Sequence, residues 1–296
     1  RQGYVLPEET YEVELEYNGQ ETELLSAEVK ITNKPVKVSL KKKEEGTENG
    51  LKGVKFAVWE KETPEEETIY VTDKEGRIEI KYLSPGTYCV QERESIPGYL
   101  KDDTVWEFTV DGTGRIKGKE SMEYEIENKK TKIKDTEAFW KGSGEKEIYA
   151  GKEAVIADTV SLRNLEPGQQ YTLKGTLADP ETGKILEENG RPAAVINTFT
   201  AEKQSQEIQM EFPVDTARIE ERQIVVFESL YIGDVLIYTH ADPDDKGQTV
   251  SILKKPEVSA ATGDSAGKRA EIVVFCVALL LPAAFIAARC ARKKKA

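Results

Sequence analysis

The stretch Ile224–Ile252, IVVFESLYIGDVLIYTHADPDDKGQTVSI, decides the fold that we expect for this chain. Its apolar residues occur in short runs of the length and composition of β-strands. It also holds the only histidine of the protein, His240, with Glu228 inside an apolar run and Gln248 at the start of the last run. The sequence therefore predicts chemically capable side chains confined to a β-sheet.

The composition predicts a folded protein and argues against nucleic-acid binding. The length of 296 residues suggests about two domains, and an apolar fraction of 38% is enough to form their cores. The net charge of -12 and the pI near 5.0 argue against nucleic-acid binding, which needs clustered Lys and Arg. The three cysteines, at positions 89, 276 and 290, give no disulfide framework.

The C-terminal region predicts a membrane anchor. Residues 272–288, IVVFCVALLLPAAFIAA, carry no charge, can cross a membrane as one helix, and precede the basic tail 289–296. The positive-inside rule places this tail in the cytoplasm and the rest of the chain outside the cell. The alternative is a buried core helix, although such a helix seldom ends the chain in a run of lysines.

An internal repeat indicates tandem modules. Residues 3–33 and 98–128 both open on Gly-Tyr, share an aromatic residue followed by Glu (11–12 and 106–107), and end on an Asn that Lys follows, all at the same spacing. We therefore expect 1–34 to be the C-terminal part of a truncated module and 35–130 to be a complete copy. The start on Arg1 without a secretory signal agrees with a missing N-terminal part.

The complete copy has the pattern of short strands separated by turns. Asn49-Gly50, Pro85-Gly86 and Pro97-Gly98 are turn signals, and no helical period is present. Beyond an alternating run at 36–40, the expected strands are 54–59, 69–71, 77–80, 87–91, 105–110 and 122–126. The predicted fold class is all-β, with tandem immunoglobulin-like β-sandwiches followed by the C-terminal transmembrane helix.

Three strands of this module extend an apolar face with a polar residue: Lys42, Glu92 and Asn128. Each alone is compatible with a strand end that turns to solvent, but together they form a chemical set. A lysine in apolar surroundings has a lowered pKa and becomes a neutral amine nucleophile, and a buried protonated glutamate polarises an amide. We expect Lys42 to attack Asn128, with Glu92 moving protons and ammonia leaving.

At these residues the sequence resembles the SpaA/CnaB-type domains of Gram-positive surface proteins and pilins. The resemblance spans 35–130 and rests on VSLKK at 38–42, LKGVKF at 51–56, LSPGTY at 83–88, PGY at 97–99 and EN at 127–128. It implies an isopeptide bond between Lys42 and Asn128, promoted by Glu92. Strand alternation points Lys41 and Lys43 outward, which excludes them as the nucleophile.

The next module, 131–254, is also predicted to be β-rich. Its expected strands are 155–162, 171–177, 194–199, 206–212, 223–231, 235–240 and 248–253. Polar residues again lie on inward faces, namely Asp158, Glu228, His240 and Gln248. Because a buried polar group without partners is costly, we expect these residues to meet one another.

This module resembles the VaFE-type domains of Gram-positive surface-anchored proteins over nearly its full length. The resemblance rests on DTV at 158–160, LEPG at 165–168, YTLKGTL at 171–177, VVFESLY at 225–231 and HADPDDKGQT at 240–249. It implies an ester between Gln248 and a threonine of the first strand, which maps to Thr136. Family members often have Thr-Thr where this chain has Asp135-Thr136, so Thr131 remains an alternative.

The ester requires a base, because a hydroxyl is a poor nucleophile until its proton is removed. His240 is the only side chain here that titrates near neutrality, so we expect it to take that proton. Asp158 and Glu228 would orient the histidine and, one of them protonated, polarise the Gln248 amide.

Other interpretations of His240 remain open. It can stabilise a turn through Asp242 and Asp245, or bind a metal with Asp242, Asp244 and Asp245, although Ca²⁺ loops need more ligands. It can also serve an extracellular hydrolase, but nothing marks a Ser or Cys nucleophile. A bond formed within the fold consumes its own catalysts, so we expect no enzymatic turnover, no cofactor and no metal.

Residues 255–271 form a linker before the predicted helix. PEVSAATGD at 256–264 resembles the sorting signal of wall-anchored proteins, which a sortase-type transpeptidase cuts between Thr and Gly. Thr262-Gly263 fits in position, whereas Ser259-Ala260 replaces the usual Leu-Pro. The alternative is a plain linker to a permanent anchor.

Together these features predict a cell-surface stalk, pilin-like protein or adhesin of a Gram-positive bacterium. Its expected partners are a sortase, the cell wall, the membrane and, through the missing N-terminal part, a host or matrix ligand. The alternative is a receptor or sensor ectodomain that signals through the helix.

Overall fold

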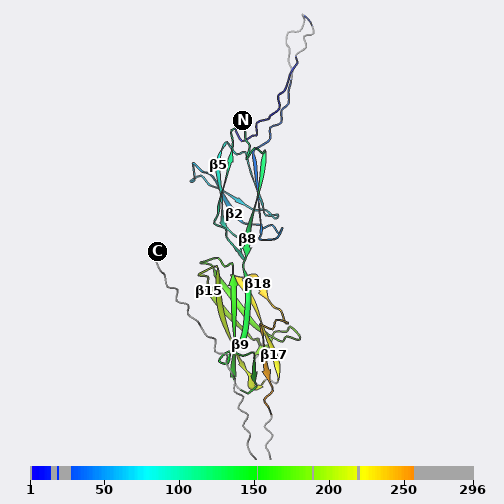
Figure 1. The fold of residues 1–296 in the computed structure, drawn as a ribbon, viewed down its shortest axis with the longest axis vertical. Coiled ribbons are helices and arrows are strands. Elements are labelled where there is room, and N and C mark those ends of the chain that lie inside the picture. The colour runs from blue at the N-terminus through cyan, green and yellow to red at the C-terminus, as the bar shows by residue number, and fades with distance from the viewer. Residues whose placement is uncertain are drawn as a thin grey trace, which may run out of the picture. The chain divides into compact units, whose positions relative to one another are not determined.

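The computed structural model describes residues 2–14, 19, 28–151, 153–188, 190–218 and 221–256. Within these ranges the regular structure is β-strand, apart from one short 3₁₀ turn, η1 (Thr216–Arg218) (Figure 1). No helix in the described ranges is long and apolar enough to cross a membrane. The predicted helix at 272–288, the tail at 289–296 and the sorting residues Thr262 and Gly263 lie outside the described residues.

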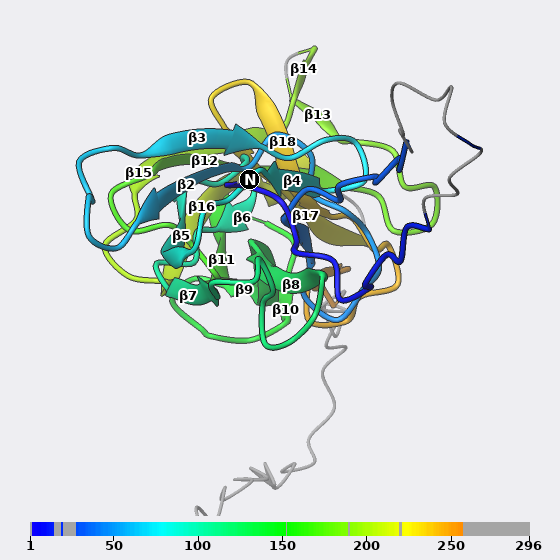
Figure 2. The same ribbon diagram turned by 90° about the horizontal axis from the view of Figure 1, so that it is seen from above.

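The first module is a sandwich of two four-stranded sheets. Its strands are β1 (Lys37–Glu44), β2 (Lys55–Glu60), β3 (Thr68–Val71), β4 (Arg77–Lys81), β5 (Gly86–Glu94), β6 (Tyr99–Leu100), β7 (Val105–Val110) and β8 (Ser121–Lys130). One sheet has the order β4-β1-β8-β6 and the other β3-β2-β5-β7. Figure 2 shows the same ribbon from above. The first and last long strands, β1 and β8, are therefore neighbours in one sheet, and they run parallel.

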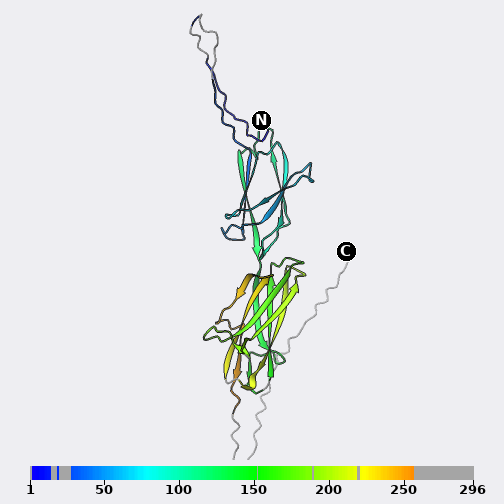
Figure 3. The same ribbon diagram turned by 180° about the vertical axis from the view of Figure 1, so that it is seen from behind.

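The second module is a sandwich of unequal sheets (Figure 3). Its strands are β9 (Lys132–Trp140), β10 (Glu147–Tyr149), β11 (Glu153–Arg163), β12 (Gln170–Ala178), β13 (Glu187–Glu188), β14 (Arg191–Pro192), β15 (Ala194–Thr200), β16 (Ser205–Asp215), β17 (Arg222–Ile232), β18 (Val235–His240) and β19 (Thr249–Leu253). The larger sheet has the order β10-β19-β17-β12-β15, with β18 on β17, and the smaller sheet has the order β16-β11-β9. First and last strands thus belong to different sheets here.

Each module has its own apolar core between its sheets. Phe56, Ile80 and Ile116 are fully buried in the first core, and Trp140 and Tyr171 are buried in the second. Burying such side chains stabilises a fold by about 1.5–3 kcal/mol each. The prediction of all-β sandwich modules is therefore confirmed for the described residues.

The internal repeat has a structural counterpart. Tyr99 pairs with Lys130 between β6 and β8, and Tyr4 forms an isolated bridge with Pro35. Tyr4 precedes Tyr99 by 95 positions, and Pro35 precedes Lys130 by the same 95 positions. Val5 also packs into the core of the first module. The N-terminal segment thus makes the same pairing as its counterpart in the complete copy.

The backbone of Lys42 is fixed by tight neighbours. Its N–H donates to the carbonyl of Gly76 at 2.7 Å, and its carbonyl accepts from the N–H of Leu51 at 2.9 Å. Gly76 has a φ of 76°, and a Cβ added there would lie 2.1 Å from the Lys42 carbonyl oxygen. The close approach that positions Lys42 therefore requires glycine at this position.

Replacing Gly76 by alanine should destabilise the first module by at least about 1–3 kcal/mol, because strain at positive φ adds to the clash with Lys42. The matched control is Gly118→Ala, since Gly118 also has a φ of 76° but an added Cβ there meets nothing within 4 Å. Both are compared by urea unfolding in an Asn128→Ala background, in which the predicted bond cannot form. Equal losses in the two variants would contradict this account of how Lys42 is held.

Candidate functional site

The first candidate site is built around a fully buried lysine. The side chains of Lys42 on β1 and Glu92 on β5 have no exposed surface, and Lys42 Nζ lies 2.9 Å from Glu92 Oε2. Nζ also donates to the Glu127 carbonyl at 3.3 Å and lies 5.7 Å from the centre of the Phe56 ring. Strand alternation explains the placement, because Lys42 continues the inward face of β1 onto the carboxylate of the opposite sheet.

The other oxygen of the same carboxylate binds the asparagine. Asn128 Nδ2 donates to Glu92 Oε1 at 2.8 Å and to Ser95 Oγ at 3.0 Å. Lys42 pairs with Ile126 in the β1–β8 register, which puts Asn128 two residues further along the same face. The three residues that the sequence predicted are thus brought together, and Ser95 joins them. Ser95 was not predicted, because it lies just after β5, where the alternation has ended.

Burial changes the chemistry of Lys42. Burial lowers the pKa of its amine, and the charge and hydrogen bond of Glu92 oppose that effect. Its neighbours behave differently, since Lys41 Nζ pairs with Glu48 at 2.6 Å and Lys43 Nζ pairs with Glu125 at 2.9 Å near the surface. Of the three lysines, Lys42 is the one that pairs with Glu92, the carboxylate that also binds the Asn128 amide.

The second candidate site gathers a hydroxyl, two carboxyls and a carboxamide. Thr136 Oγ1 on β9 lies 3.0 Å from Asp158 Oδ1 on β11 and 3.2 Å from Glu228 Oε1 on β17. Gln248 Nε2, just before β19, contacts Thr136 Oγ1 and lies 3.3 Å from Asp158 Oδ1. Asp158, Glu228 and Gln248 have no exposed surface, and Thr136 is also buried. The hydroxyl and the carboxamide that the resemblance implied are therefore in contact.

Burial sets the protonation of the two carboxyls. Burial, reinforced by the charge and hydrogen bond of the neighbouring Asp158, raises the pKa of Glu228 to about 10. Burial also raises the pKa of Asp158, while its hydrogen bonds from Glu228, Thr136 and Gln248 oppose that effect. Glu228 therefore holds a proton at neutral pH, and Asp158 is the carboxyl that remains to accept the proton of the Thr136 hydroxyl.

His240 lies beside this site rather than in it. It is opposite Glu228 in the β17–β18 register, but its Nε2 pairs with Asp245 Oδ2 at 2.9 Å. Asp245 in turn accepts from the N–H of Gly247 at 2.7 Å and, through its carbonyl, from the hydroxyl of Thr249 at 2.8 Å. The position that we predicted for the histidine, next to the hydroxyl proton, is occupied by Asp158. His240 instead pairs with Asp245, in the loop that directly precedes Gln248.

The alternative threonine is engaged elsewhere. Thr131 Oγ1 donates to the carbonyl of Asn164 at 2.8 Å, whereas Thr136 Oγ1 contacts the carboxyls and the carboxamide. The geometry therefore favours Thr136 as the reacting hydroxyl.

Unsatisfied polar atoms concentrate at these two sites. Among the described residues, the buried side-chain oxygens without a hydrogen-bond partner are Tyr124 Oη, Asn128 Oδ1, Asp158 Oδ2, Glu228 Oε2 and Gln248 Oε1. All but the tyrosine belong to the two sites, and two of them are the carbonyl oxygens of the carboxamides. Because buried polar atoms are normally paired, this concentration marks groups arranged for something other than stability. Each set can transfer an acyl group from a carboxamide to an adjacent nucleophile.

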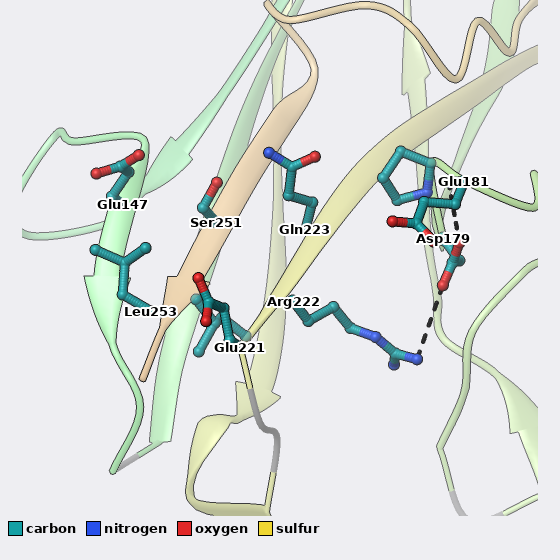
Figure 4. Close-up of a pocket in the computed structure, with 10 residues that line it drawn as sticks. Glu147, Asp179, Glu181, Glu221, Arg222, Gln223, Ser251 and Leu253 are labelled. Carbon is teal, nitrogen blue, oxygen red and sulfur yellow. Dashed lines mark hydrogen bonds and ion pairs between the residues drawn. The ribbon is translucent and has the colours of Figure 1, made fainter. Parts of the chain in front are cut away.

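A cavity of about 510 Å³ lies near the ends of β17 and β19 (Figure 4). It is lined by Glu147, Asp179, Pro180, Glu181, Glu221, Arg222, Gln223, Ser251, Ile252 and Leu253. Arg222 faces Asp179 at 3.8 Å across it. Neither of the two sets of buried groups lines this cavity, and its described lining contains no histidine or cysteine. Ser251 is the side chain of this lining that a hydrolase could use as a nucleophile, and no histidine accompanies it there.

Comparison with protein families identifies both modules. Residues 36–130 match the SpaA family, described as a prealbumin-like fold domain, and residues 107–252 match the TQ family, described as a T-Q ester bond containing domain. The second match begins within the first module and includes both Thr136 and Gln248. No curated protein sequence matches the chain.

Several solved structures are similar to the chain. An adhesin of Mobiluncus mulieris containing intramolecular disulfide, isopeptide and ester bond cross-links has 16% identity and a TM-score of 0.36, covering 42% of this chain and 57% of the adhesin. The major pilin BcpA of Bacillus cereus has 15% identity and a TM-score of 0.30, covering 73% and 68%. The major pilin SpaD of Corynebacterium diphtheriae has 12% identity and a TM-score of 0.33, covering 74% and 64%.

The chain spans little more than half of the adhesin. The family matches are more specific, because each covers most of one module and contains the residues gathered at its buried site. Residues 36–130 of this chain therefore match the SpaA prealbumin-like domain, and residues 107–252 match the T-Q ester bond containing domain.

Proposed function

We propose that the protein is a structural stalk, pilin subunit or adhesin of a Gram-positive cell surface, with each module locked by a covalent bond that it forms within itself. One observation carries this proposal: in both modules a nucleophile near one end and a carboxamide near the other meet at a buried carboxyl. The description of the second family as an ester bond domain supports the same chemistry.

In the first module the product is an isopeptide bond. The neutral amine of Lys42 attacks Cγ of Asn128, and a new C–N bond forms. Glu92 binds both nitrogens, so it can accept a proton from the attacking amine and deliver one to the departing Nδ2. The bond from Cγ to Nδ2 breaks, and ammonia leaves. Ser95 holds the departing nitrogen through its Oγ.

In the second module the product is an ester. Asp158 accepts the hydroxyl proton of Thr136, Oγ1 attacks Cδ of Gln248, and a C–O bond forms. The carboxyl of Glu228, protonated at neutral pH, is the acid of the site. The proton taken by Asp158 passes to Nε2 of Gln248, which also contacts Asp158, the bond from Cδ to Nε2 breaks, and ammonia leaves. His240 supports this step by ordering the loop before Gln248.

Both bonds would close long loops. The isopeptide joins positions 86 residues apart, since 128 minus 42 is 86, and the ester joins positions 112 residues apart. By analogy with disulfides, each would stabilise its module by roughly 4–5 kcal/mol through the lost entropy of the unfolded chain. The effect on resistance to pulling would be larger than this thermodynamic gain, because force could not extend the chain between the two joined positions. Such locking suits a stalk that bears force outside the cell.

The anchoring part of the proposal rests on sequence. The Thr262-Gly263 pair, the apolar segment 272–288 and the basic tail would retain the chain at the membrane until a sortase joins it to the cell wall. A host or matrix ligand would be bound by a part of the protein N-terminal to these modules.

The intact protein should have a mass lower than its sequence mass by two molecules of ammonia. Lys42→Ala and Gln248→Ala should each restore one ammonia, because each removes one reactant. Thr136→Val should restore one as well, whereas Thr131→Val, with its hydroxyl on Asn164, should restore none. Intact-mass spectrometry measures all four variants. A wild-type mass equal to the sequence mass would overturn the proposal.

Without its ester, the second module should lose stability as pH rises. In a Gln248→Met variant Glu228 keeps its buried surroundings, so the native state holds a proton that the unfolded chain releases above about pH 4.5. The native state thus binds more protons between about pH 4.5 and about pH 10, and the free energy of unfolding falls across this window.

Denaturant titrations at several pH values measure this slope. The control is Gln248→Met combined with Glu228→Gln, which cannot titrate at position 228 and should show a flatter profile. Profiles of equal slope would show that Glu228 is not protonated in the native site.

Cells that produce Thr262→Ala should release less of the protein into the wall fraction and retain more in the membrane fraction, because the bond cut by the sortase is altered. Ser259→Ala, outside the predicted cleavage pair, is the matched control. Fractionation followed by immunoblotting measures the distribution. Wall attachment at the wild-type level in Thr262→Ala cells would favour another means of anchoring.

A further inference from the structure

A lysine outside both reactive sets joins the reacting segments of the second module. Lys146 lies between β9 and β10, and its Nζ donates to the carbonyl oxygen of Ala138 and, at 2.6 Å, to that of Gly247. Ala138 follows Thr136 by two residues, and Gly247 directly precedes Gln248. One ammonium group therefore connects the backbone beside the hydroxyl to the backbone beside the carboxamide.

Sheet pairing does not by itself fix the distance between these segments. β9 belongs to the smaller sheet and β19 to the larger one, so no shared ladder sets their register. The N–H of Ala138 donates to the Gly247 carbonyl at 2.9 Å, and this carbonyl is one of the two that Lys146 binds. A Cβ added at Gly247 would lie 3.3 Å from the Thr136 carbonyl oxygen, which shows how closely the segments approach. Lys146 thus reinforces the crossing point of the two segments.

The charge of Lys146 also suits the reaction. Burial lowers the pKa of its partly buried amine, and the carboxylates of Glu137, Asp245 and Asp158 oppose that effect. A positive charge near Asp158 favours the ionised form of this carboxyl, which is the form that accepts the hydroxyl proton. Geometry and charge therefore act in the same direction.

We propose that Lys146 is a positioning residue for ester formation, which holds the Thr136 hydroxyl against the Gln248 carboxamide by binding the Ala138 and Gly247 carbonyls. This inference rests on the proposed function, because it concerns the ester that the second module would form. Lys146 exchanges no atom with the reactants and acts through the backbone beside them.

The test compares rates of ester formation in full-length protein followed from a short pulse of cell-free synthesis, before either bond has formed. Samples are quenched in acid at intervals, and peptide mapping by mass spectrometry measures the Thr136–Gln248 and Lys42–Asn128 bonds separately. Lys146→Met should slow the ester by about tenfold or more, because small displacements of reacting groups cost large factors in rate. Lys146→Arg, which keeps the charge and the donors, should recover most of the wild-type rate.

Two controls separate positioning from general stability. Lys141→Met removes an exposed lysine of the same region that pairs with Glu211 at 2.7 Å, and it should leave the rate unchanged. The Lys42–Asn128 bond, measured in the same molecules, should form at the wild-type rate in every variant. In a Gln248→Ala background, urea unfolding of Lys146→Met should show a second module that is still folded under the conditions of the rate measurement.

The outcomes are distinct. Wild-type protein that forms no ester would overturn the proposed function and this inference with it. An ester that forms in Lys146→Met at the wild-type rate would overturn the inference alone. A slowed ester that Lys146→Arg does not recover would show that the donors and charge are not the cause, and would also overturn it.

Discussion

Both sites depend on a carboxyl group held inside an apolar sandwich, where an unpaired charge would be strongly destabilising. Glu92 is tolerated because its two oxygens bind Lys42 and Asn128. Asp158 and Glu228 are tolerated because Glu228 is protonated at neutral pH and the Thr136 hydroxyl lies against both carboxyls. The contacts that offset the cost of burying these carboxyls are the same contacts that hold the nucleophile next to the carboxamide and to the group that would transfer the proton.

The two modules apply this constraint to different nucleophiles. An amine becomes a nucleophile when it loses its proton. At Lys42 burial favours that loss, because it lowers the pKa of the amine. A hydroxyl needs a base, so the second module supplies a pair of carboxyls with divided roles. The strand arrangement differs as well: β1 and β8 are neighbours in one sheet, whereas β9 and the segment before β19 approach from different sheets.

The strands β1, β5 and β8 alternate regularly up to Lys42, Glu92 and Asn128, so the sequence predicted that these three side chains point inward, where the structure brings them together. It did not predict β9 as a strand, because the segment is rich in charges and its alternation breaks at Lys134, where the register with β11 shifts. Family resemblance alone located Thr136. The role expected for His240 followed from the ordinary pKa values of side chains in water. Burial, which a sequence does not display, raises the pKa of Glu228 to about 10 and keeps this carboxyl protonated at neutral pH.

The central claim is that these buried groups are reactants that have already combined in the mature protein. The most direct measurement is a crystal structure at high resolution of protein purified without denaturation. The account predicts continuous electron density from Lys42 Nζ to Asn128 Cγ and from Thr136 Oγ1 to Gln248 Cδ, with no density for the departed nitrogens. Separate side chains at hydrogen-bonding distance in both modules, each with its own carboxamide nitrogen, would contradict it.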